Sequence, residues 1–117
     1  MAFIKEEEAI FNGLKEVAQQ MVLAARTAPK ARGVSTLFTA ITGREEIDRI
    51  ADRMVQIGEA NGQSFFLRDA ENIRSSPLLV LLGTRIHPLN LFYCGYCGFE
   101  NCSEKIKHPE VPCVFNT

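Results

Sequence analysis

The residues of this sequence best suited to chemistry are four cysteines near its C-terminal end. Three of them lie in the stretch YCGYCGFENC, Tyr93 to Cys102, and Cys113 follows eleven residues later. Cysteines can hold an iron–sulfur cluster or a zinc ion, pair as disulfides, or act as redox-active nucleophiles. The spacing of the cysteines and the residues around them favour some of these kinds of chemistry over others.

The spacing favours an iron–sulfur cluster, with two, four and ten residues between successive cysteines. Three thiolates on a tight loop, with a fourth returning from further along the chain, can converge on a compact cluster. Gly95 and Gly98 each follow a cysteine, and without a Cβ they let backbone amides approach the sulfur atoms. Pro112 fixes the backbone direction just before Cys113.

Zinc is the main alternative, because it also accepts four thiolates and its structural sites often begin with a CxxC pair. Such sites usually use two separated CxxC pairs, whereas the second half here consists of Cys102 and Cys113 alone. His108 is a further candidate ligand, although its place before a proline in a polar stretch is typical of an exposed loop histidine. A thioredoxin-like use of the Cys94–Cys97 pair would leave the other two cysteines unexplained.

Composition limits the class of protein. A chain of 117 residues with 46% hydrophobic and 23% charged residues predicts one globular domain spanning residues 1–117. The formal net charge of −1 gives no field that would attract nucleic acid. The longest strongly apolar run, Pro77 to Gly83, is too short to cross a bilayer, and the N-terminus lacks the pattern of a signal peptide. We therefore expect a cytoplasmic protein whose reduced cysteines bind a metal or act in redox chemistry rather than form disulfides.

Two amphipathic helices are predicted in the first half of the chain. The first runs from about Glu6 to Ala28, where Pro29 makes continuation unfavourable. The second follows a capping box formed by Thr42 and Glu45 and ends at Asn61–Gly62. Their apolar positions recur at helical spacing: Ile10, Leu14, Val17, Met21 and Ala25 in the first helix, and Ile47, Ile50, Ala51, Met54 and Val55 in the second.

Two strands are predicted between and after these helices. Thr36 to Thr42 is rich in β-branched residues, and Leu78 to Gly83 is apolar on both faces, as expected of a strand covered on both sides. Between them, Phe65–Leu67 is predicted as a short apolar anchor followed by a turn or irregular helix. The order helix–strand–helix–strand predicts an α/β fold with a core in residues 1–90 and a cysteine segment in residues 91–117 that leaves the second strand.

The cysteine motif CGYCGFENC resembles that of a family of bacterial and archaeal proteins of unknown function that contain a ferredoxin domain. The stretches AARTAPKARG (24–33) and RDAENIRSSP (68–77) resemble that family in the same order, so the likeness covers nearly the whole chain. The CGxCGxxxC core is also similar to a segment that binds a [4Fe–4S] cluster in membrane-associated electron-transfer subunits. That likeness implies Cys94, Cys97 and Cys102 as three ligands, and Cys113 is the candidate for the fourth.

One departure from that family concerns the end of the chain. Family members continue past the last cysteine into a Gly/Ala-rich segment, whereas this chain ends four residues after Cys113. We interpret it as a fragment or a shortened member. If a C-terminal helix is missing, apolar surface on the second strand is left exposed, which would favour self-association or a partner.

The predicted function is that of an iron–sulfur electron-transfer module with an unknown redox partner protein. An enzyme alternative is a flavin reductase, because the helix–loop–strand around AARTAPKARG is loosely similar to that of nitroreductase-type flavoproteins. In that interpretation Arg26, Lys30 and Arg32 contact the phosphate of FMN, and the fold is a truncated nitroreductase-like arrangement. The alternative interpretation of these three basic residues is structural: cations at the C-terminus of a helix interact favourably with its dipole.

Overall fold

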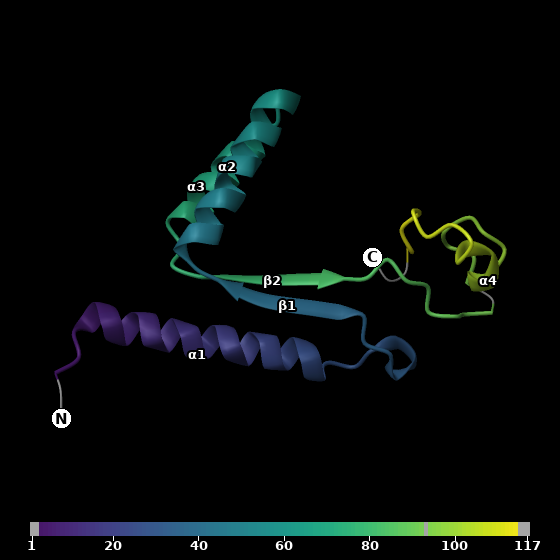
Figure 1. Cartoon of the computed structure of the whole chain (residues 1–117), viewed down its shortest axis with the longest axis horizontal. Coiled ribbons are helices and arrows are strands. Elements are labelled where there is room, and N and C mark those ends of the chain that lie inside the picture. The colour runs from purple at the N-terminus through teal and green to yellow at the C-terminus, as the bar shows by residue number, and fades with distance from the viewer. Residues whose placement is uncertain (1–2, 93, 115–117) are drawn as a thin grey trace. The chain divides into compact units, whose positions relative to one another are not determined.

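The computed structural model describes residues 3–92 and 94–114 and has a mixed α/β fold (Figure 1). The elements follow in the order α1 (Glu6–Thr27), a short 3-10 helix η1 (Ala31–Gly33), β1 (Leu37–Thr42), α2 (Arg44–Asn61), α3 (Ser64–Arg74), β2 (Leu79–Thr84) and α4 (Cys102–Lys105). The two strands pair with each other in one antiparallel sheet. The predicted α/β class is confirmed, with α3 as an additional regular helix between α2 and β2.

Helix α1 begins and ends within one residue of the predicted bounds. Its first turn holds three glutamates, Glu6 to Glu8, where the helix dipole favours negative charge. The predicted apolar face is present, but most of it is exposed, and Ala18 is the residue of α1 that is buried among those described. The hydrophobic pattern therefore predicted the helix correctly, although the face that it marks has little of the described chain against it.

The start of α2 differs from the prediction. The N-cap is Gly43 in extended conformation, with no side-chain cap hydrogen bond, so the Thr42–Glu45 capping box is wrong. Thr42 is instead the last residue of β1, one position before the N-cap. The predicted end is confirmed, because Gly62 takes the left-handed conformation (φ 66°) and its N–H donates to the carbonyl of Gly58.

Helix α3 corrects the prediction of an anchor with an irregular segment. Phe65 to Leu67 form its first turn, and the helix continues regularly to Arg74. Arg74 Nη2 donates to Asp52 Oδ1 of α2 at 2.7 Å, and this hydrogen bond raises the pKa of Arg74 above its ordinary value. With Ala70 of α3 and Ile47 of α2 fully buried, the helix pair forms the core of this part of the chain.

Strand β2 is less covered than predicted. Its first two residues are half-buried and its last four are exposed, with Leu82 at 60% of its full exposure. The expectation of a strand covered on both faces is therefore wrong for the described chain, because Leu81 and Leu82 point to opposite faces of the sheet and both are exposed.

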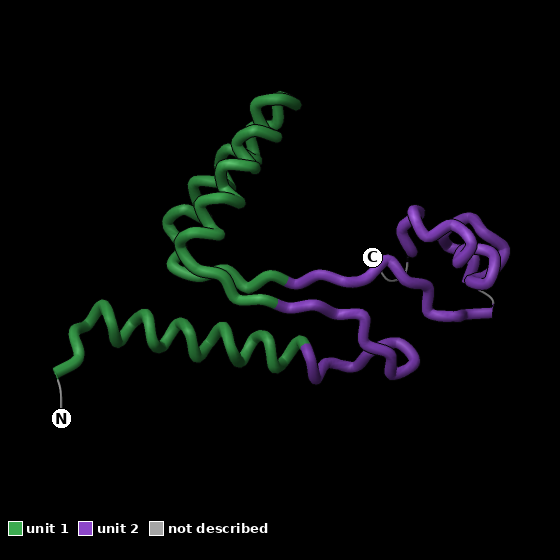
Figure 2. The backbone as a smooth tube through the Cα atoms, viewed as in Figure 1, with its two compact units in different colours: residues 1–25, 40–81 green, residues 26–39, 82–117 purple. Residues whose placement is uncertain are grey.

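The chain divides into two compact units, coloured separately in Figure 2. Unit 1 comprises residues 1–25 and 40–81, and unit 2 comprises residues 26–39 and 82–117. Unit 1 holds α2, α3 and most of α1, and unit 2 holds the cysteine segment. The single domain predicted from the sequence, with a core in residues 1–90, stays a prediction.

Candidate functional site: the cysteine segment of unit 2

All four cysteines lie in unit 2 and are free thiols. Cys94, Cys97 and Cys102 are half-buried, and Cys113 is buried. The segment that contains them follows β2, as the sequence predicted, after the connection of residues 85–92. Thiols that are neither disulfide-bonded nor fully hidden remain available to a metal.

Gly95 and Gly98 shape the turn that contains Cys97. Gly95 and Gly98 have φ values of 76° and 89°, a region that residues with a side chain rarely adopt. The Gly98 N–H donates to the Gly95 carbonyl at 3.1 Å and closes the turn around Cys97. Glycine at both positions allows this turn without a steric cost, whereas an approach of backbone amides to the sulfur atoms around these glycines stays a prediction.

Cys102 is the cysteine whose surroundings are best defined. It is the first residue of α4, and the side chain of the N-cap residue Asn101 accepts from the Glu104 N–H at 2.9 Å. The Leu91 N–H donates to Cys102 Sγ at 3.1 Å, in a partly buried contact between residues eleven positions apart. Hydrogen bonds to the ligand sulfur atoms are a feature of thiolate-bound clusters, whose reduction potential they adjust.

Lys105 is a further residue of this segment that the cysteine pattern does not predict, and it is unusual because its side chain is buried. Its side chain is 1% exposed, and its Nζ donates to the carbonyl of His108 at 3.1 Å. An ammonium group has three donors, and a buried one is costly unless anions or several acceptors surround it. Lys105 lies three positions after Cys102 in α4, so both residues share one face of this helical turn. That spacing is the signal in the sequence that could have identified it.

The two histidines occupy ordinary loop positions. The ring of His108 stacks on Phe99 with 4.9 Å between centroids, and its Nδ1 lies 3.7 Å from Glu110 Oε1. His87 follows β2 in the exposed connection. The interpretation of His108 as an exposed loop residue is confirmed, and stacking on Phe99 holds its ring in place.

The structure does not bring the predicted ligands together. Within residues 3–92 and 94–114, no three cysteine, histidine, aspartate or glutamate side chains are grouped so that they could hold a metal ion. A cavity of about 140 Å³ lies beside Cys102, lined also by Leu91 and Asn101. The donor chemistry, the glycine turn and the amide on Cys102 fit a thiolate-bound group, whereas the four sulfur atoms would have to move together to form one site. The assignment of four ligands stays a prediction.

The basic residues of the flavin alternative donate hydrogen bonds to other groups of the chain itself. Arg26 donates to Ser35 Oγ at 2.8 Å and to the Leu37 carbonyl at 3.2 Å. Lys30 donates to the Ala28 carbonyl, and Arg32 donates to the Leu89 and Asn90 carbonyls at 3.3 and 2.7 Å. The contacts of Arg26 and Arg32 tie the loop after α1 to β1 and to the connection before the cysteines, and that of Lys30 lies within the loop.

Comparison with known proteins identifies one relative at substantial identity. The chain is similar to an uncharacterised protein of Archaeoglobus fulgidus, with 37% identity over 101 residues, which are 86% of this chain and 54% of that protein. The chain thus spans about half the length of the curated relative it matches. No family model and no solved structure matches the chain. In the described part of the chain, none of the helices combines the length and the apolar character needed to cross a membrane.

Proposed function

We propose that this chain binds a [4Fe–4S] cluster through Cys94, Cys97, Cys102 and Cys113 and serves as an electron-transfer module for a redox partner protein. The observation that carries the proposal is the polar environment of Cys102, where a backbone amide donates to its sulfur and the buried Lys105 lies on the same helical turn. The proposal includes a cytoplasmic location, where thiols stay reduced, without nucleic-acid or membrane binding.

The charge balance supports this proposal. Four thiolates and their cluster carry net negative charge, and hydrogen bonds to the sulfur atoms adjust the reduction potential. A buried ammonium such as that of Lys105 has an electrostatic reason to exist beside such a group, because it compensates that charge. When bound, the cluster would take up and release one electron at a time. The half-buried Cys94, Cys97 and Cys102 would leave one side of it within reach of a partner.

Cluster binding would be coupled to folding of the cysteine segment. Residues 103–112, SEKIKHPEVP, hold few apolar side chains, and α4 orders the first three of them. Drawing Cys113 toward the other three cysteines would fix both ends of this stretch, so part of the binding free energy would be spent as folding free energy.

The deciding experiment is a metal and sulfide assay on the full chain purified without oxygen. We expect iron and acid-labile sulfide in near-equal amounts and a broad visible absorption that bleaches with dithionite. Zinc without sulfide would replace the proposal with a structural zinc site, and a yellow sample with a flavin spectrum would support the flavin reductase alternative.

A pair of variants tests the fourth ligand. Cys113→Ser should lose or convert the cluster and increase proteolysis between Glu104 and Val111, whereas His108→Ala should keep the cluster. The stacking of His108 on Phe99 gives it a packing role, so its loss should change local protection more than metal content. The reverse result, with metal lost in His108→Ala and kept in Cys113→Ser, would assign the fourth position to His108 and favour zinc.

A further inference from the structure

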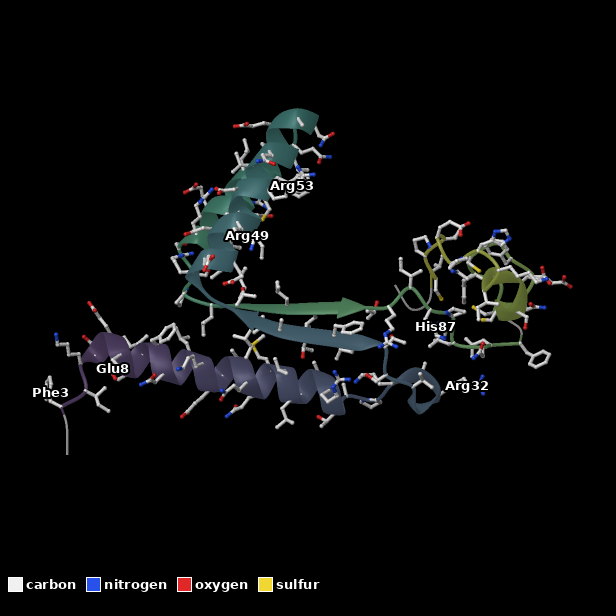
Figure 3. The ribbon with its side chains drawn as sticks, in the orientation of Figure 1. Phe3, Glu8, Arg32, Arg49, Arg53 and His87 are labelled. Atoms are coloured by element: carbon white, nitrogen blue, oxygen red, sulfur yellow. The ribbon has the colours of Figure 1, made fainter. Side chains whose placement is uncertain are left out.

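Unit 1 contains a cavity whose lining residues, between Thr42 and Leu81, are far in the sequence from the cysteines. It is a groove of about 430 Å³ between α2 and the sheet, and its lining includes three apolar side chains, Ile50, Met54 and Leu81, which we call its floor. Arg49 and Arg53 line it from one side of α2, where Figure 3 shows both side chains. The groove therefore combines an apolar floor with two cations one helical turn apart.

The cations of this groove are poorly neutralised. Within the described residues Arg49 makes no ion pair, and Arg53 Nη1 donates to the uncharged Gln56 Oε1 at 3.2 Å. Glu46 is the acidic residue of the lining and also lacks an ion pair among the residues that the structure describes. Thr42 Oγ1, at the same groove, is buried without a hydrogen-bond partner among residues 3–92 and 94–114. A ligand with an apolar body and acidic groups would complement this surface.

The beginning of α1 has the complementary chemistry. Phe3 is 90% exposed and Ile4 is also exposed, and the three glutamates Glu6 to Glu8 follow directly. None of these glutamates makes an ion pair within residues 3–92 and 94–114. Figure 3 shows Phe3 and Glu8 at this end of the helix. One short segment therefore carries an aromatic side chain and a run of unpaired carboxylates.

We propose that residues 3–8 of one copy of this chain dock in the groove of a second copy. An aromatic ring needs about 150 Å³, so the groove has room for Phe3 together with a neighbouring apolar side chain. Residues 3–5 precede α1, so Phe3 and Glu6 lie at most roughly 10 Å apart, and Arg49 and Arg53 are separated by about 6 Å along the axis of α2. With Phe3 on the apolar floor, the carboxylates reach the arginine side of the groove.

Two copies of the chain can make this contact reciprocally. Each copy carries both the acidic segment and the basic groove, so a two-fold arrangement makes the contact twice. The exposed apolar stripe of α1, which includes Ile10, Leu14, Val17 and Met21, continues from the docking segment and adds apolar surface to the interface. Since the charges lie at a surface, the association weakens as salt rises.

The experiment measures the mass of the full chain in solution by sedimentation over a wide range of concentration. We expect multiples of the monomer mass at low salt and a weaker association at high salt. The variant Arg49→Glu/Arg53→Glu and the variant Glu6→Lys/Glu7→Lys/Glu8→Lys should each be monomeric, because like charges then face each other. Mixing the two variants should restore association, since each segment then meets a groove of opposite charge.

The controls separate docking from folding and from total charge. Arg68→Glu/Lys107→Glu makes the same change in net charge as the groove variant, at exposed positions outside the groove and outside α1, and should keep the association. Phe3→Ser retains every charge and should raise the dissociation constant by about tenfold or more, because the buried aromatic contact is lost. Circular dichroism tests whether each variant keeps its helices. If a charge variant unfolds, the association of Phe3→Ser and the salt dependence of the wild type still test the docking. A monomeric wild type at all concentrations, or a mixture of charge variants that stays monomeric, overturns the proposal.

Discussion

Substituting Gly58 by alanine should destabilise unit 1, although glycine is a poor helix former. Gly58 is buried in α2, opposite the first turns of α3. A Cβ placed there would lie 3.0 Å from Phe66 Cβ, 3.1 Å from the Gln63 carbonyl oxygen and 3.2 Å from Leu67 Cδ2. Real contacts of a Cβ are rarely so short, so α2 and α3 would have to move apart.

The neighbours of Gly58 have little freedom to move. Gln63 is held on both sides, because its N–H donates to the Gly58 carbonyl at 2.9 Å and its carbonyl accepts from the Phe66 N–H at 3.2 Å. Alanine gains about 1 kcal/mol in helix propensity, whereas overpacking a tight contact costs roughly 1–3 kcal/mol. We expect a net loss of about 1 kcal/mol in the free energy of unfolding.

Gly13→Ala is the matched control. Gly13 lies in α1, and a Cβ there would meet nothing within 4 Å. The same substitution should therefore show the propensity gain alone, about 0.5–1 kcal/mol of added stability. Urea unfolding followed by circular dichroism measures both variants, and an unchanged slope would show that the midpoints report stability. If Gly58→Ala unfolds at the same or a higher urea concentration than the wild type, the packing argument is wrong.

Three further predictions concern the core and unit 2. Ile47→Ala, at a fully buried position, should lower the free energy of unfolding by about 2–5 kcal/mol, measured by urea titration. Lys105→Met should lower the reduction potential of a reconstituted cluster because a buried positive charge is lost; an unchanged potential in a titration would place Lys105 away from it. Arg32→Met removes two hydrogen bonds to backbone carbonyls, worth about 1 kcal/mol at this partly exposed position, and should speed proteolytic cleavage within residues 85–92. Cleavage at the wild-type rate would contradict the tethering role of Arg32.

Local signals in the sequence were sufficient for several features. The end of α1 is predicted by Pro29, and the end of α2 by Gly62, because each residue restricts or permits a backbone conformation regardless of its tertiary neighbours. The turn of Gly95 and Gly98 belongs to the same class. The clustering of the cysteines is likewise a property of the sequence, and the metal and sulfide assay identifies the group that they bind.

Other features depended on which segments meet in the folded chain. Thr42 could serve as a strand residue or as a helix cap, and pairing of β1 with β2 decided for the strand. The apolar residues of 65–67 form a regular helix because α2 offers a buried surface to α3, with Ala70 at the contact. In the opposite sense, Leu82 is apolar and still exposed, since burial needs a neighbouring element and the pattern of one strand cannot supply it. The burial of Lys105 has the same origin: local sequence places a lysine in a helical turn, and only the surrounding chain determines whether its charge faces water.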